Sequence, residues 1–281
     1  MQVHEITTAS DWAALAGGHP LPLPQTWAYG AAVEAVGRDV QRLAVMDKDR
    51  PVALAQIVTR RVAGLRMGLL SNGPVALAAA DPRRALRAAC PWPTLVTPPR
   101  KWRGLPLSAR PQVALWDLSP APPDLRAGLH PKWRNALRAA EAEAAVTVSF
   151  PAATPDSLAP LLRAEKARQA AGHYRALPPE FALALHAAAP QSLLLVTALD
   201  AAMLFVQEGA GATYLISHAG PQARAANAPR ALLWQAALRL RARGVTHLDL
   251  GTIDPAKAPD LARFKTRTGA RVESLGAAVL L

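Results

Sequence analysis

The sequence lacks the residue patterns that mark disulfide frameworks, metal centres and the common nucleotide cradles. One cysteine, Cys90, in 281 residues excludes an intrachain disulfide and a zinc site built on clustered cysteines. The seven histidines are scattered, with no HExxH or other paired spacing. No GxxxxGK(S/T) loop, GxGxxG turn or GxSxG elbow is present. We therefore expect no bound metal and no nucleotide loop of these kinds.

Acidic residues are also scarce. Asp and Glu number 20 against 32 Lys and Arg, so the net charge is +12, with +6 in residues 1–130 and +6 in residues 131–281. The excess reflects either a skewed codon composition or a polyanionic partner such as RNA, a nucleotide sugar or a membrane surface. Hydrophobic residues make up 51% of the chain, which excludes disorder as its main state.

Long apolar runs are missing as well. The stretch from Phe181 to Leu199 has no Asp, Glu, Lys or Arg, but Pro190 to Ser192 divides it into a helix and a strand. The first residues show no basic segment followed by an apolar one, the pattern of a secretory signal. We expect a cytoplasmic protein without stable membrane insertion.

Helical and strand patterns alternate along the chain, which indicates an α/β or α+β fold. In the second half, the pattern predicts a strand over 146–150, an antiparallel meander of three strands over 193–217, and a helix over 229–244 with a strand after it. Two further strands, 272–275 and 278–281, close the chain. Both halves share a rough order of elements, so we expect a duplicated domain, 1–130 and 131–281, whose last strands pair with either sheet.

Five segments carry a resemblance to a known family, and the last of them reads LDLGTI followed by LARFKTRTG. The segments are Gln25–Gly30; Asn72–Val75; Trp116–Ser119 with Leu129–Glu141; Tyr214–Ser217 with Ala228–Trp234; and Leu248–Ile253 with Leu261–Gly269. Together they resemble the FemABX family of peptidoglycan bridge-forming aminoacyltransferases. The last segment is similar to that family's Y-D-F-G-G-I and L-x-x-F-K-x-x-F-G, with Thr252 replacing a glycine and Thr268 an aromatic residue. The chain is shorter than those enzymes and lacks a coiled-coil arm.

The resemblance implies two tandem GNAT-like α/β domains, each a mixed sheet flanked by helices. It also implies transfer of an aminoacyl group from aminoacyl-tRNA to an amine of a peptide or a nucleotide-linked muropeptide. Such a transfer requires a positioned amine and a cation or backbone amides near the developing oxyanion. It requires no metal, no cofactor and no nucleophile from the protein.

Two residues are candidates for the chemistry. Lys265 occupies the position of the lysine that the resemblance assigns to stabilising the transition state; the alternative is one more solvated cation. Asp249 stands at the carboxylate position of the preceding motif and could orient the amine or accept its proton. Its alternative role is that of a hydrogen-bonded residue at a strand end that fixes the turn at Gly251.

Several further residues are candidates for substrate binding. In the family an arginine in the region of Arg175 binds the diphosphate of the acceptor, a role that suits the planar guanidinium fork. Tyr214 and Ser217, on a predicted central strand, could line the acceptor channel or belong to the core. Phe264 precedes the motif lysine and is placed with the substrate-binding residues.

Trp27 and Arg134 complete the candidates. Trp27 could stack on a base or a sugar, although an interdomain core tryptophan is the preferred interpretation. Arg134 and Arg138 lie one helical turn apart and share a face, which could contact RNA or could simply be solvated.

Two other functions stay open. One is a CoA- or acyl-carrier-dependent N-acyltransferase on the same fold, and the other is a binding module that has lost the chemistry. Ordinary GNAT enzymes bind CoA with a loop that requires a glycine at one position. The segment of this chain most similar to that loop is Gln207 to Ala212, and it has Ala210 at the position of that glycine.

Overall fold

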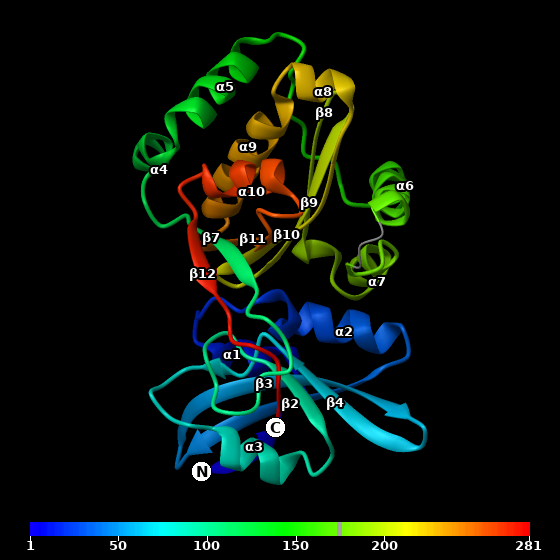
Figure 1. Cartoon of the computed structure of the whole chain (residues 1–281), viewed down its shortest axis with the longest axis vertical. Helices are drawn as coiled ribbons and strands as arrows, with labels where there is room; N and C mark the ends of the chain where they lie inside the picture. Colours follow the sequence, from blue (N-terminus) through cyan, green and yellow to red (C-terminus); the bar gives the residue numbers. More distant parts are fainter. Residues whose placement is uncertain (173–175) are drawn as a thin grey trace. The chain divides into compact units, whose positions relative to one another are not determined.

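The computed structural model describes residues 1–172 and 176–281 and divides into two compact units (Figure 1). The first unit comprises residues 1–113 together with 273–281, and the second comprises residues 114–272. Each unit is built on one mixed sheet with flanking helices, as the sequence predicted. Residue 130 lies inside the second unit, between α4 (Pro122–Gly128) and α5 (Pro131–Ala142).

The first unit contains a seven-stranded sheet in the order β1-β2-β3-β4-β6-β13, with β5 paired to β3. Its strands are β1 (Gln2–Glu5), β2 (Asp39–Asp47), β3 (Arg50–Val62), β4 (Leu65–Ser71), β5 (Val75–Ala76), β6 (Thr94–Thr97) and β13 (Val279–Leu280). Its helices are α1 (Ala9–Ala16), the short η1 (Leu23–Gln25), α2 (Trp27–Ala35) and α3 (Arg83–Ala89). The β4–β6 pair is parallel, and the other pairs of this sheet are antiparallel.

Alternation along β3 explains how this sheet is covered on both faces. Leu54 packs with Trp12 of α1 in one buried cluster, whereas its neighbour Ala53 packs with Leu86 of α3 in another. Successive side chains of a strand point to opposite faces, so the two clusters lie on the two faces of one sheet. The central strands are therefore apolar almost throughout.

The second unit contains a six-stranded sheet in the order β12-β7-β11-β10-β9-β8. Its strands are β7 (Gln112–Asp117), β8 (Leu193–Ala198), β9 (Ala201–Glu208), β10 (Gly211–Ala219), β11 (His247–Ile253) and β12 (Arg271–Ser274). Besides α4 and α5, its helices are α6 (Pro155–Gly172), α7 (Phe181–Ala188), the short η2 (Pro190–Ser192), α8 (Pro221–Ala225), α9 (Ala228–Ala242) and α10 (Pro259–Thr266). The predicted meander is confirmed, because β8, β9 and β10 pair antiparallel in chain order.

Helix α9 is the central helix of this unit. Pro229 lies in its first turn, where a missing backbone N–H costs nothing, and its buried residues recur at helical spacing. These are Ala228, Ala231, Leu232, Leu233, Trp234, Ala236, Ala237 and Leu240. The helix connects β10 to β11, and these two strands run parallel.

One predicted strand is wrong. Of residues 146–150, only Ser149 pairs with the sheet, exchanging two 2.9 Å backbone hydrogen bonds with Thr197. The N–H groups of Val146 and Thr147 instead donate to the carbonyls of Glu143 and Ala145 in the preceding turn. Residues 146–150 do alternate between apolar and polar side chains. Their first N–H groups, however, are already bonded within the turn and cannot pair with a neighbouring strand.

The two closing strands join different sheets. β12 belongs to the sheet of the second unit, and β13 pairs antiparallel with β6 in the first. The described part of the chain contains no helix with the length and apolarity needed to cross a membrane.

Candidate active site

The site of interest lies where β10 and β11 stop pairing. Their parallel register covers only Gly211–Thr213 against His247–Asp249, and β10 is irregular between Tyr214 and Ile216. Beyond Thr213 the two strands share no further registered pairs, so their backbone and side chains are available to other groups. Helix α10, which follows β11, brings Lys265 to this place.

Lys265 is a buried lysine with an exposed fraction of 6%. Its Nζ donates a 2.9 Å hydrogen bond to the carbonyl oxygen of Thr252 and lies 5.8 Å from the ring centroid of Tyr214. Burial lowers the pKa of Lys265 to about 8; the charge of Asp249 opposes this shift and that of Arg168 adds to it. The residue is therefore largely cationic at pH 7, and its proton can be removed in the range where enzymes work.

Asp249 and Gly251 shape the end of β11 beneath this lysine. Oδ1 of Asp249 accepts a 2.7 Å hydrogen bond from the Gly251 N–H. Burial raises the pKa of Asp249, while this hydrogen bond and the charge of Lys265 act in the opposite direction. Gly251 has φ +79°, and a Cβ there would lie 3.5 Å from Lys265 Nζ. The positive φ favours glycine in the LDLG segment, whereas a Cβ at that distance would make only an ordinary contact.

Tyr214 and Ser217 lie on the irregular part of β10 and are half-buried. The ring of Tyr214 packs 5.5 Å from that of Phe205. Burial raises the pKa of Tyr214, and a hydrogen bond with Ser217 lowers it. The two predicted residues therefore lie together, in the neighbourhood of Lys265.

Helix α6 adds two charged residues to the same neighbourhood. Glu165 is 4% exposed and forms an ion pair with Arg168, and the charges of both act on Tyr214. Neither Glu165 nor Arg168 was among the residues predicted from the sequence. A signal was available, because Glu165 falls on the helix face of the buried Leu158, Leu161 and Leu162, where an acidic residue is unusual.

The two departures from the family motif have structural explanations. Thr252 contacts Lys265 through its backbone carbonyl, so this interaction does not depend on its side chain. Thr268 is fully buried, and its hydroxyl donates 2.7 Å to the Lys265 carbonyl and accepts from Ala270 N–H at 3.2 Å. Thr268 thus caps the end of α10 with hydrogen bonds.

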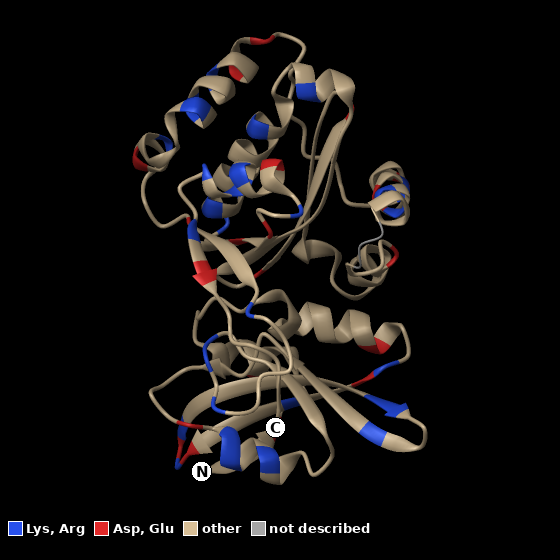
Figure 2. Cartoon of the chain, viewed as in Figure 1, with Lys and Arg blue, Asp and Glu red and all other residues tan. Residues whose placement is uncertain are grey.

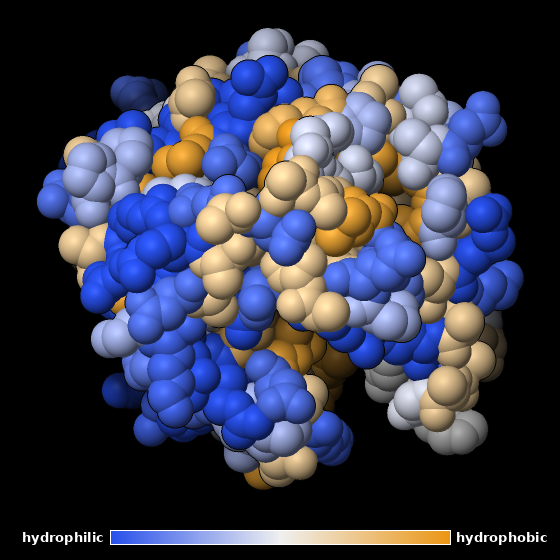
Figure 3. All heavy atoms as spheres, turned by 90° about the horizontal axis from the view of Figure 1, so that it is seen from above, coloured by the Kyte–Doolittle hydropathy of each residue, from blue (hydrophilic) through white to orange (hydrophobic). Residues whose placement is uncertain are grey.

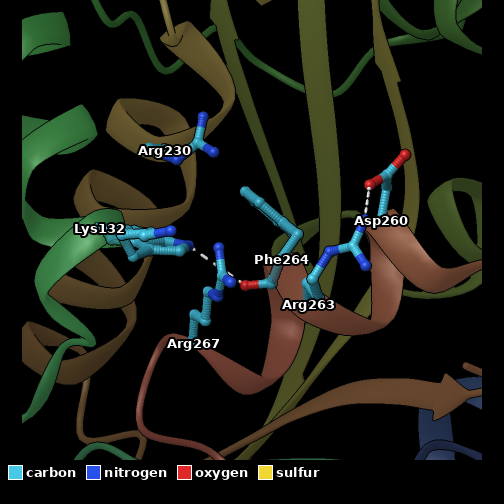
Figure 4. Close-up of a pocket in the computed structure, with 7 residues that line it drawn as sticks. Lys132, Arg230, Asp260, Arg263, Phe264 and Arg267 are labelled. Carbon is cyan, nitrogen blue, oxygen red and sulfur yellow. Dashed lines mark hydrogen bonds and ion pairs between the residues drawn. The ribbon is translucent and has the colours of Figure 1, made fainter.

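A cationic pocket of 290 Å³ lies on the other side of α10 (Figure 4). Four of its lining side chains are cationic, and they come from α5, α9, α10 and the residue directly after α10. The lining residues are Lys132, Trp133, Arg230, Asp260, Arg263, Phe264 and Arg267. Asp260 is the only acidic residue among those described that line it, and it pairs with Arg263.

Arg230 and Arg267 give the pocket its electrostatic character. Burial and the charge of Arg267 both lower the pKa of Arg230. Its Nη1 donates 2.9 Å to Asn227, but its buried Nε has no hydrogen-bond partner in the structure. Two like charges and an orphaned donor at the start of α9 favour an anion, which the helix dipole also favours. Phe264 links this pocket to the neighbouring Lys265 in the chain.

The remaining predicted residues lie elsewhere. Trp27, in the first unit, begins α2, and the guanidinium carbon of Arg42 lies 4.0 Å from its ring centroid. Arg134 donates 3.0 Å to the carbonyl of Ala127 and does not line the cationic pocket. Arg175 falls outside the described residues.

Most of the surface in Figure 3 is hydrophilic, with apolar residues in small areas.

Other catalytic chemistries find little support in the described residues. Burial raises the pKa of the Cys90 thiol to about 11, so it is a poor nucleophile at neutral pH. Among residues 1–172 and 176–281, no group of three or more His, Cys, Asp or Glu is arranged to hold a metal ion. The site therefore offers a buried cation, a carboxylate and a pocket lined by cationic side chains.

Comparison with known proteins shows the fold. No family model matches the sequence, and no curated protein does. The chain is similar to the crystal structure of FemX, with a TM-score of 0.77 and 14% identity over 99% of this chain and 96% of that one. It is also similar to a tandem GNAT protein from the clavulanic acid biosynthesis pathway, determined without AcCoA. That comparison has a TM-score of 0.52 and 14% identity over 100% of this chain and 98% of that one. A third similar structure is a protein of unknown function from Bacteroides thetaiotaomicron VPI-5482, with a TM-score of 0.57 and 12% identity over 98% of this chain and 97% of that one. The predicted tandem GNAT fold is thus confirmed along the whole chain.

Proposed function

We propose that this chain is an N-acyltransferase of the FemABX type. It would transfer an aminoacyl group from aminoacyl-tRNA to an amine of a peptide or cell-wall precursor in the cytoplasm. The observation that carries the proposal is the buried Lys265 at the open end of a parallel strand pair, on a helix that also lines a cationic pocket. The motif resemblance and the likeness to FemX support the choice of family.

The reaction joins an amine nitrogen to the carbonyl carbon of an ester. The attack forms a C–N bond and a tetrahedral intermediate whose former carbonyl oxygen carries negative charge. Collapse breaks the C–O bond to the ribose hydroxyl and yields an amide. The proton lost by the amine balances the alkoxide that leaves, so no external oxidant, metal or further reactant enters.

Lys265 would supply the positive charge that the oxyanion requires. It is held by the Thr252 carbonyl and is largely protonated at pH 7, in a site where little water weakens its field. Asp249 raises the pKa of this lysine and so favours the charged form against burial. One Asp249 oxygen is engaged by Gly251, and the other would take the proton of the attacking amine.

The cationic pocket would hold a phosphate near the ester of the donor. Arg230 and Arg267 present guanidinium groups that match phosphate oxygens, and Lys132 adds a third charge. On the acceptor side, Tyr214 and Ser217 would line the channel. Arg175 would bind the diphosphate of a nucleotide-linked acceptor, a role that rests on the sequence resemblance.

A CoA-dependent N-acyltransferase is the second candidate. The pocket at the start of α9 suits a pyrophosphate as well as a phosphodiester, and one similar structure is a tandem GNAT protein determined without AcCoA. The Gln207–Ala212 segment, however, forms the turn between β9 and β10 rather than a loop before a helix. This position disfavours the ordinary CoA loop at that segment.

A screen of three ligands followed by a transfer assay tests the proposal. Charged tRNA, acetyl-CoA and a nucleotide-linked muropeptide are each added in a thermal-shift series, because a ligand well above its Kd raises Tm. We expect shifts with charged tRNA and the muropeptide, and label in the muropeptide when both are present. A shift and transfer with acetyl-CoA alone would favour the second candidate. Binding without any transfer would leave a binding module on the same fold.

A further inference from the structure

The hairpin of β3 and β4 in the first unit exposes an apolar face. Val62 is 39%, Leu65 69%, Met67 37% and Leu69 39% exposed, although large apolar side chains of a sheet are normally covered. The register pairs Val62 with Leu65, Arg60 with Met67 and Val58 with Leu69. Directly opposed residues of antiparallel strands share a face. These side chains therefore form one continuous surface around Arg60.

The opposite face of the same hairpin carries opposed like charges. Arg61 and Arg66 are cross-strand partners, an arrangement that destabilises a sheet unless an anion intervenes. Arg66 lies over Trp92, with its guanidinium carbon 3.8 Å from the ring centroid. The sequence from residue 50 to residue 80 contains no Asp or Glu, so this segment supplies no carboxylate of its own. Figure 2 shows the resulting blue positions on the hairpin.

We infer that the β3–β4 hairpin docks on an anionic lipid surface. Exposed aliphatic residues flanked by arginines match such a surface, since the former enter the headgroup region and the latter meet lipid phosphates. RNA would account for the arginines but not for the exposed Leu65 and Met67, because bare bases are bound mainly by stacking on aromatic rings. A second copy would bring the same three arginines and the same net charge of +12 to the interface.

The turn geometry places the apolar side chains at the tip. Ala63 and Gly64 form a two-residue turn with φ of 48° and 81°, values that tighten the hairpin between Val62 and Leu65. Leu65, the most exposed of these four side chains, thus stands at the end of the hairpin. This arrangement suits shallow, reversible binding, independent of the acyl-transfer site in the second unit.

Vesicle co-sedimentation of the full chain tests the inference. We expect binding to vesicles of equal parts phosphatidylglycerol and phosphatidylcholine, and at least about tenfold weaker binding to phosphatidylcholine alone. Leu65→Glu with Met67→Glu should lower the affinity for anionic vesicles by roughly tenfold or more. Arg60→Gln with Arg61→Gln should lower it roughly fivefold per charge and reduce its salt dependence. If the double variant does not fold, the single variant Leu65→Glu replaces it in the same measurement.

A matched control is Leu199→Glu, which places the same charge at a leucine 42% exposed in the second unit and should bind like wild type. Failure of the wild-type protein to bind anionic vesicles would overturn the inference. So would wild-type binding by the Leu65→Glu, Met67→Glu variant. Dimerisation or RNA binding that depends on Leu65, without vesicle binding, would assign the hairpin to another partner and also overturn it. None of these outcomes bears on acyl transfer, which is measured separately with soluble substrates.

Discussion

Both units contain a parallel strand pair, but the side chains beside the pair differ between them. In the first, parallel β4 and β6 are paired over four residues, Gly68–Ser71 with Thr94–Thr97. In the second, parallel β10 and β11 are paired over three and then stop. The polar groups beside these strands differ: in the first unit two glutamine amides bond to the backbone and to Arg42, which pairs with Glu34, and in the second unit ionisable side chains gather around Lys265.

The amides of the first unit form a closed network. Gln25 donates to the carbonyls of Gln56 and Ser71 at 3.1 and 2.7 Å and accepts from Gln56 N–H at 2.7 Å. Gln56 in turn accepts from Arg42 and donates to Pro24 and Thr26. Every group finds a partner inside the unit, which is the property of a structural core. The QTW segment, which resembles a family motif, thus has a structural explanation in this unit.

The ionisable groups of the second unit behave differently. Burial moves the pKa values of Lys265, Asp249 and Tyr214 away from their ordinary values, and α6 brings Glu165 and Arg168 beside them. Clustered, perturbed groups of this kind characterise reactive sites more than cores. The comparison teaches that a similar strand arrangement can adjoin a closed hydrogen-bond network in one unit and a cluster of ionisable groups with shifted pKa values in the other.

The largest expected effect follows from removing the buried cation. Lys265→Met should lower the transfer rate on the order of 100- to 1,000-fold, because the charge that meets the oxyanion is lost. The KM for the acceptor should change little, since the interaction strengthens in the transition state. Rates are measured with saturating donor over a range of acceptor concentrations, which gives both the turnover rate and the KM.

The control for that variant is Lys257→Met. Lys257 has an 87% exposed side chain and lies 3.9 Å from Asp254, so its loss should leave the rate at the wild-type value. Equal rates for Lys265→Met and wild type would exclude Lys265 from the reaction and abolish the contrast between the units.

The cationic pocket should influence donor binding. Arg230→Ala and Arg267→Ala should each weaken donor binding about tenfold, the loss of a charge-assisted hydrogen bond of about 1.5 kcal/mol. The slope of log affinity against log salt should also become shallower for an RNA donor. Fluorescence titration with a labelled donor measures both quantities. Arg263→Ala, whose guanidinium is paired with Asp260, is the matched control and should show a smaller loss.

The first unit should respond in stability rather than rate. Gln25→Ala would leave the Gln56 N–H and the Ser71 carbonyl without this partner and should cost about 1–3 kcal/mol of unfolding free energy. Denaturant unfolding followed by circular dichroism measures the loss. The rate per folded molecule should stay near wild type. A strong loss of rate in stably folded Gln25→Ala protein would show that the first unit also shapes the reaction.

A small effect is expected from α6. The charge of Arg168 lowers the pKa of Lys265, so Arg168→Gln should raise it. The alkaline fall of the transfer rate should then move to higher pH by less than one unit, with little change in rate at pH 7. A pH–rate profile of the variant beside wild type checks this shift. An unchanged profile would mean that Arg168 does not act on Lys265.

The sequence foretold much of this arrangement but not all of it. Lys265, Asp249 and Gly251 were identifiable because they are close in sequence and belong to one strand–helix segment. Glu165 and Arg168 were not, because α6 lies about a hundred residues earlier in the chain and only the fold brings it to β10. The convergence of Lys132 and the pocket arginines from three helices was hidden for the same reason.

The local sequence pattern was insufficient in two places. The strand predicted over residues 146–150 reduced to a single bridge, because the neighbouring N–H groups bonded within a turn. Trp27 could be read as a stacking platform or a core residue, and the sequence could not reveal that Arg42 covers its ring. The partner that decides the position of Trp27 lies outside its local sequence, whereas residues 146–150 are decided by the turn directly before them.

The most direct test of the central claim follows the proton on Lys265. Nitrogen NMR of the lysine side chains, assigned with Lys265→Met, gives its pKa, and single-turnover transfer over the same pH range gives the rate. Because the amine must be neutral to attack, an acceptor with a low amine pKa keeps the alkaline limb interpretable. We predict that Lys265 titrates at about 8 and that the rate falls with the same midpoint as the cation is lost. Titration at the ordinary lysine pKa, or a rate that rises as Lys265 loses its proton, would contradict the account.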